Sequence, residues 1–174
     1  LGTVPFNMTI RQIRSDLDQF APVWGVRLAD DAIADTETAL SIEADAGEGR
    51  TTVLQHPLFL AVPPGLMSRE SIVTADLGRA VNLGAPGRLM LSDSAPGTRE
   101  VLMQTGPAPS FIPADRAAIE ISAGDTVGLY EASDMGPAPL AVRVSGPLIS
   151  AFPDGAPRLD IPDDPIDAEL VRAA

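Results

Sequence analysis

Seventeen prolines and fifteen glycines are spread along this chain of 174 residues and divide it into short segments. Proline fixes φ and lacks a backbone donor, and both residues favour turns, so long regular elements are interrupted wherever they occur. The longest uninterrupted apolar stretch, residues 58–62, ends at Pro63 and Pro64. It is far shorter than the roughly 20 apolar residues that a membrane-spanning helix needs. The spacing therefore predicts a folded chain of short strands joined by turns, with no bilayer span.

Charge and composition exclude several classes of function. The chain has 24 acidic and 12 basic residues, a net charge of −12, which repels nucleic acids and anionic lipid headgroups. It has no cysteine and one histidine, His56, so disulfides, thiolate metal sites, cysteine nucleophiles and multi-histidine metal clusters are ruled out. Aromatic residues make up only 4% of the chain, which leaves little with which to build a stacking platform for bases or sugars.

The N-terminal region shows a helical pattern. Between residues 8 and 24 the apolar residues recur at steps of three and four: Ile10, Ile13, Leu17, Phe20 and Trp24. This spacing predicts an amphipathic helix, with a kink or an early end at Pro22 and a stop at Gly25. We expect Trp24, the largest side chain, to be largely buried along this stripe.

After Gly25 the chain has the pattern of short strands between proline and glycine turns. Strands are expected at residues 26–28, 38–43, 52–62, 88–91, 100–104 and 140–144. Turns are expected at 47–49 and 135–139, and Asp115 is placed to cap a short helix. We therefore expect an α+β fold with a mixed or mostly antiparallel sheet of about five or six strands and the N-terminal helix on one face. Part of a Rossmann-like α/β sheet is the alternative.

One α+β domain is expected over residues 1–153, followed by an acidic, proline-rich tail over 154–174. The tail carries a D-x-x-D-D-x-x-D array of carboxylates: Asp160, Asp163, Asp164 and Asp167. Carboxylates are ligands for calcium, but the array lacks the central glycine and terminal glutamate of the usual calcium loop. We interpret it as a solvated tail rather than a cation site.

His56 is the one residue that invites a catalytic interpretation. A histidine before a proline at the end of a strand can in principle serve as a general base. A serine hydrolase also needs a nucleophile elbow of the G-x-S-x-G type, and the chain contains none. We therefore expect His56 to have a structural role. A hydrolase that uses His56 is the weakest functional hypothesis for this chain.

Four short patterns follow one another between Ser15 and Pro153. In chain order they are Ser15-Asp16-Leu17 with Trp24-Gly25-Val26, Asp35 and Ala39-Leu40; Ser71-Ile72-Val73-Thr74 with Leu77 and Val81-Asn82-Leu83; Val101-Leu102-Met103-Gln104-Thr105; and Pro139-Leu140-Ala141-Val142 with Gly146 and Ser150-Ala151-Phe152. In this order they resemble the extracytoplasmic region of the ABC-type uncharacterized transport system auxiliary family, which includes the gliding-motility GldG-like proteins. The fourth pattern is the most specific.

The resemblance implies a non-enzymatic extracytoplasmic domain of an ABC transporter accessory protein, serving as a scaffold or in partner interaction. It implies the permease and ATPase subunits of the transporter as partners. It also implies a periplasmic or extracytoplasmic location, with the full-length protein anchored to the inner membrane by segments outside this chain. The segments that flank this region in the family are not found here, so we expect the chain to be a piece of a longer protein.

No catalytic, cofactor-binding or metal-binding residue is implied by the resemblance. The positions that it marks as structural are Trp24, Gly25, Asp35, Thr105, Gly146 and Phe152. We expect Trp24 and Phe152 to pack as anchors, and Gly25 and Gly146 to allow turns or close approaches. A carbohydrate-binding or small polar ligand-binding domain is the alternative function, and the low aromatic content disfavours it.

Overall fold

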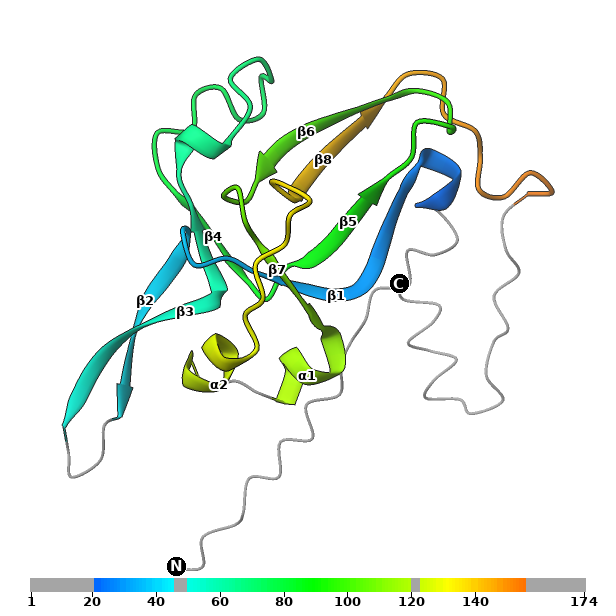
Figure 1. The fold of residues 1–174 in the computed structure, drawn as a ribbon. Coiled ribbons are helices and arrows are strands. Elements are labelled where there is room, and N and C mark those ends of the chain that lie inside the picture. The colour runs from blue at the N-terminus through cyan, green and yellow to red at the C-terminus, as the bar shows by residue number, and fades with distance from the viewer. Residues whose placement is uncertain (1–20, 46–49, 120–122, 156–174) are drawn as a thin grey trace, which may run out of the picture.

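The computed structural model describes residues 21–45, 50–119 and 123–155 of the chain (Figure 1). In chain order the elements are η1 (Pro22–Trp24), β1 (Val26–Ala34), β2 (Ala39–Asp45), β3 (Thr51–Val62), η2 (Pro64–Leu66), β4 (Val81–Gly84), β5 (Gly87–Leu91), β6 (Thr98–Gln104), β7 (Ser110–Pro113), α1 (Ala114–Ile119), α2 (Ala123–Gly128) and β8 (Pro139–Ser145). The two η elements are single 3-10 turns, and both α-helices are short.

The strands form three small sheets instead of one. Their orders are β5-β1-β7, β2-β3-β4 and β6-β8. Every pairing among these strands is antiparallel, so the expected mostly antiparallel character is confirmed. The Rossmann-like alternative, which needs a largely parallel sheet, does not fit this part of the chain.

All six predicted strand segments lie within observed strands or overlap them. The prediction for residues 52–62 matches β3 to within one residue. The prediction for 26–28 was too short, because β1 continues to Ala34 past a change of register between Leu28 and Ala32. The short strands β4 and β7 were not predicted. The short helix expected near Asp115 is present as α1.

Most of the expected N-terminal helix, residues 8–20, lies outside the described residues. The described end of it is the 3-10 turn η1, and the chain then turns into β1 at Gly25, the expected stop. Trp24 is half-buried and lies outside the core, whereas it was expected to be largely buried. Its indole N–H donates to the carbonyl of Ile149 at 3.1 Å. The hairpin expected around 47–49 is supported by the pairing of Asp45 with Thr51, although its tip is not described.

Aliphatic side chains form two core clusters, and β3 contributes to both. One consists of Ala32, Ala34, Leu58, Ile112 and Ala117, and the other of Leu60, Val62 and Met67. The second half of β3 is mostly buried, whereas its first half is exposed and forms with β2 the long ribbon at the lower left of Figure 1. Strand alternation explains why Leu58, Leu60 and Val62 all face the interior.

A buried carboxylate joins the three sheets. Asp35, 1% exposed, follows β1, and its Oδ1 accepts a hydrogen bond from the backbone N–H of Glu37 at 3.0 Å. Its Oδ2 accepts from the hydroxyl of Thr38, just before β2, and from the N–H of Gly106, just after β6, both at 2.8 Å. Gly106 and Asp35 are 71 positions apart in sequence, so this last bond joins two distant segments of the chain. Figure 1 shows the elements β1, β2 and β6 that these segments adjoin. We name Asp35, Thr38, Thr105 and Gly106 the Asp35 junction.

Thr105 extends the Asp35 junction toward β8. Its backbone N–H donates to the carbonyl of Ala138 at 3.0 Å, and its Oγ1 accepts from the N–H of Ala138 at 2.9 Å. The same hydroxyl donates to the carbonyl of Gly106 at 2.8 Å. Thr105 is fully buried, so each of these bonds satisfies a group that water does not reach.

Gly25 sits in a tight corner between η1 and β1. Its φ of 72° lies in the left-handed region, and its carbonyl accepts from the N–H of Ser92 at 2.9 Å. A Cβ at this position would lie 2.7 Å from the carbonyl oxygen of Ser92 and 2.8 Å from both Cβ of Ala95 and Nη1 of Arg99. The Arg99 guanidinium in turn donates to the carbonyls of Ala95 and Pro96. Only glycine fits this corner without displacing its neighbours.

We predict that Gly25→Ala lowers the free energy of unfolding by at least about 2 kcal/mol, because strain at positive φ adds to overpacking. The matched control is Gly136→Ala, which has a φ of 78° but no atom within 4 Å of the added Cβ. Urea unfolding of both variants separates the two contributions. Equal losses in the two variants would show that crowding at Gly25 contributes nothing.

We predict that Asp35→Asn lowers the free energy of unfolding by about 2–3 kcal/mol, since an amide cannot accept all three hydrogen bonds and leaves a buried donor unpaired. Asp134→Asn, at an exposed position, serves as the control and should change stability by less than about 0.5 kcal/mol. Thermal and urea unfolding measure both. If the two variants were equally stable, the Asp35 junction would not hold the sheets.

Candidate functional site

A cleft of about 290 Å³ lies between β5 and the segment that leads into β8. Its lining residues are Arg88, Leu89, Met90, Leu91, Phe111 and the run from Met135 to Pro139. One wall is β5, an edge strand of its sheet. The other wall is shaped by Gly136, with a φ of 78°, and by two prolines that limit its backbone. We name this hollow the β5 cleft.

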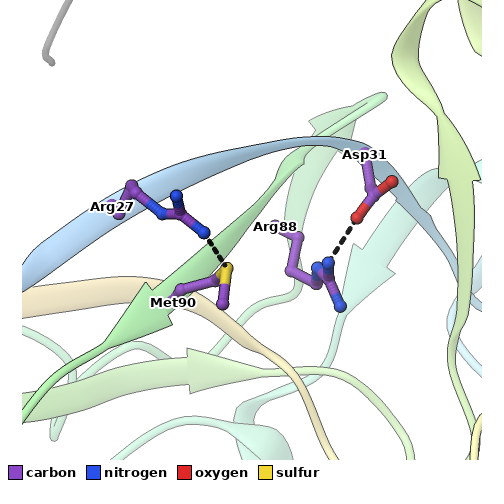
Figure 2. A network of polar contacts seen from close by, with 4 residues as sticks. All are labelled: Arg27, Asp31, Arg88 and Met90. Carbon is purple, nitrogen blue, oxygen red and sulfur yellow. Dashed lines mark hydrogen bonds and ion pairs between the residues drawn. The ribbon is translucent and has the colours of Figure 1, made fainter.

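Arg88 supplies the positive charge of the β5 cleft. Its guanidinium forms an ion pair with Asp31 on β1, and the two side chains are each about a quarter exposed (Figure 2). The guanidinium carbon also lies 4.4 Å from the centroid of the Phe111 ring, a cation–π arrangement. Its Nε is buried and has no hydrogen-bond acceptor in the described part of the chain. Two partners therefore hold Arg88 in place at the wall of the cleft.

A second arginine lies beside the first on the same face of the sheet. Arg27 on β1 is paired in register with Met90 on β5, and its Nη2 donates to the Met90 sulfur at 3.3 Å (Figure 2). A thioether is a weak acceptor, so the exposed Arg27 guanidinium keeps most of its donor capacity. A second hollow, of about 300 Å³, is lined in part by Arg27 and shares Met90 and Leu91 with the β5 cleft.

The chemistry of the β5 cleft favours binding over catalysis. Its walls are mainly apolar, and Met90, Leu91 and Met135 are exposed in it. The lining residues include no serine, histidine, aspartate or glutamate, so none of them is an obvious nucleophile or general base. Exposed methionine, leucine and arginine are residues that bind apolar segments carrying an acidic group.

The positions marked from the sequence lie at turns and junctions. Asp35 and Thr105 come together in the Asp35 junction, whereas Trp24 and Gly25 lie at the other end of β1. Gly146 follows β8 with a φ of 107°, and a Cβ there would lie 3.2 Å from Cα of Gly97. The half-buried Phe152 donates its backbone N–H to the hydroxyl of Ser150 at 3.0 Å. Of these six positions, only Gly25 contributes to the lining of either hollow.

His56 lies in the core and not in the cleft. It is buried on β3, its Nδ1 accepts a long hydrogen bond of 3.4 Å from the N–H of Leu58, and its ring meets Phe59 edge to face at 4.6 Å. These contacts match the structural placement expected from the sequence. The aspartate array at 160–167 lies outside the described residues.

Within residues 21–45, 50–119 and 123–155, no group of three or more histidine, aspartate or glutamate side chains is arranged to hold a metal ion. No helix of the same ranges has the length and apolar character required to span a membrane.

Sequence reasoning missed the residues of the β5 cleft. Arg88 and Met90 lie two positions apart on β5 and so share a face, which the strand prediction for 88–91 already contained. Arg27 and Phe111 are brought to them only by the pairing of β1 with β5 and β7. The sequence of a single strand does not indicate which distant strands will pair with it.

Comparison with known proteins gives one result. No curated protein and no solved structure matches the chain. The model of one family, described as ABC-type uncharacterized transport system, matches residues 3–171, nearly the whole sequence. The chain therefore belongs to the ABC-type uncharacterized transport system family.

Proposed function

We propose that this chain is a non-enzymatic accessory domain that binds a protein partner of an ABC transport system through the β5 cleft. The observation that carries the proposal is the family match over residues 3–171, which indicates an auxiliary role in such a system. The β5 cleft supports it, because methionine and arginine are enriched where proteins bind one another.

The cleft fits a short extended segment of a partner. Its apolar wall would take the aliphatic side chains of the segment, and Arg27 would take a carboxylate beside them. A chain of net charge −12 repels acidic partners in general, so the exposed Arg27 marks a place where an acidic group is locally accepted, whereas Arg88 already pairs with Asp31.

We extend the proposal to the place and partners of the domain. The partners are the permease and ATPase subunits, the subfamily is GldG-like, and the domain lies outside the cytoplasm on a protein anchored in the inner membrane. These points are supported by the order of the four sequence patterns between Ser15 and Pro153.

The alternative function, binding of a carbohydrate or a small polar ligand, is disfavoured by the lining of the β5 cleft. A sugar needs several polar side chains and an open aromatic face. The lining offers one charged side chain and one aromatic ring, Phe111, and Arg88 covers that ring.

We predict that Arg27→Ala combined with Met135→Ser reduces co-purification of the permease or ATPase with the tagged full-length protein by about tenfold, which corresponds to about 1.4 kcal/mol. Both side chains are exposed, so the fold should be kept. Arg143→Ala is the control, because Arg143 is also exposed but pairs with Glu100 away from the cleft lining. Quantitative mass spectrometry of the purified complexes measures the ratio. An equal loss in the control would show that the cleft has no special part in binding.

The absence of cysteine from the chain allows its location to be tested directly. We predict that Val53→Cys, at an exposed position on β3, is labelled by a membrane-impermeant maleimide when the outer membrane alone is permeabilised. The full-length protein without the substitution gives the background. Labelling that requires lysis of the inner membrane would place the domain in the cytoplasm and contradict this part of the proposal.

A further inference from the structure

The loop that joins η2 to β4, residues 67–80, has an inverted arrangement of polar and apolar side chains. Ser71 and Thr74 are only 1% and 2% exposed, whereas Ile72, Val73 and Leu77 are 89%, 55% and 38% exposed. Burial of aliphatic groups and hydration of hydroxyls would favour the opposite arrangement in water. We name residues 67–80 the 67–80 loop.

Hydrogen bonds within the 67–80 loop hold this arrangement in place. The hydroxyl of Thr74 donates to the carbonyl of Ser68 at 2.7 Å, and its backbone N–H donates to the carbonyl of Ser71 at 3.1 Å. The N–H of Ala75 also donates to Ser71, at 2.8 Å, and Arg69 donates to the carbonyl of Ala75 at 3.0 Å. The Thr74 hydroxyl and these backbone hydrogen bonds thus fix the turn, and the aliphatic side chains are left outside it. The Ser71 hydroxyl is buried in the turn and has no hydrogen-bond partner among the described residues.

The base of the loop is attached to the body of the protein. Met67 is a member of a core cluster, and the N–H of Ser68 donates to the carbonyl of Leu102 on β6 at 2.9 Å. Figure 1 shows the loop projecting beyond the ends of β3 and β4 at the top of the molecule. The apolar side chains are therefore presented on an ordered, protruding support, which reduces the entropic cost of binding.

We propose that Ile72, Val73 and Leu77 form a docking surface that inserts into an apolar pocket of a protein subunit of the transport system. The inference rests on the proposed function, because it assumes that such a subunit is present. It concerns a second surface, since none of the three residues lines the β5 cleft.

The charges around the loop favour a protein over a lipid bilayer as the occupant. Arg69, Glu70, Asp76 and Arg79 are exposed on it, two of each sign. Segments that insert into membranes are typically basic and carry tryptophan or phenylalanine, and this loop has no aromatic residue and no excess of positive charge. An apolar centre with a mixed, polar rim is instead the usual composition of a protein–protein interface. The partner surface should therefore be an apolar pocket with both signs of charge at its rim.

Site-specific photocrosslinking tests the proposal in the full-length protein in its native membranes. A benzophenone amino acid is placed at Ile72 and, as the matched control, at Val53, which is 66% exposed on β3. We expect a crosslink from position 72 to a protein subunit of the transport system, identified by mass spectrometry, and none from position 53. Ile72→Asp should lower co-purification of that subunit by at least about tenfold, as loss of an interface anchor does, while Val53→Asp leaves it unchanged.

The outcomes separate this inference from the proposed function. If no transport subunit co-purifies with the unsubstituted protein, the proposed function fails. If a subunit co-purifies, and Ile72→Asp does not reduce it and position 72 gives no crosslink to that subunit, the docking inference is wrong while the proposed function stands. A loss that is equal for Ile72→Asp and Val53→Asp also overturns the inference, because the effect is then not local.

Lipid binding is measured separately. Ile72→Cys is labelled with an environment-sensitive nitrobenzoxadiazole dye and mixed with phosphatidylcholine vesicles. Unchanged emission is expected, and a blue shift with increased intensity would show insertion into lipid and overturn the choice of a protein partner.

Discussion

The carboxylate of Asp35 is the contact on which the arrangement of this domain depends. A two-stranded sheet is marginally stable at best, and a three-stranded sheet needs an apolar face to pack, so each of the three sheets needs the others. Asp35 accepts hydrogen bonds from Thr38 and Gly106, which adjoin strands of two different sheets, β2 and β6. Through Gly106 and Thr105 the same network reaches Ala138, a lining residue of the β5 cleft. The hydrogen bonds that begin at Asp35, which lies outside the β5 cleft, thus help to position Ala138 in the cleft wall.

Local sequence patterns were sufficient for most strands but not for their assembly. Residues 52–62 were predicted almost completely, because the segment is rich in β-branched and aliphatic residues and the two following prolines mark its end. The strand β7 was missed because it is short and ends in Pro113, and only pairing with β1 makes it a strand. Asp35 and Thr105 were marked by the resemblance alone, since a single aspartate after a strand has no local signature of burial.

Neither surface proposed for binding could be found from the sequence. Arg27 and Met90 are 63 positions apart, and their contact depends on the register of β1 against β5. A shift of one residue would place them on opposite faces of the sheet. In the 67–80 loop, the ordinary expectation buries Ile72 and exposes Ser71. It fails because the backbone conformation is set by the hydrogen bonds that the carbonyls of Ser68 and Ser71 accept, most of them from Thr74, and this conformation turns the Ile72 side chain outward.

The shared strand β3 has a consequence for how the domain opens. Leu58 belongs to one core cluster, and Leu60 and Val62 belong to the other, so neither cluster can separate from β3 without disturbing the adjoining residues of the same strand. Subglobal opening needs a boundary that few contacts cross, and β3 removes that boundary between the two clusters. Amide exchange along residues 58–62 should consequently occur only through global unfolding, so that three small sheets behave as one cooperative unit.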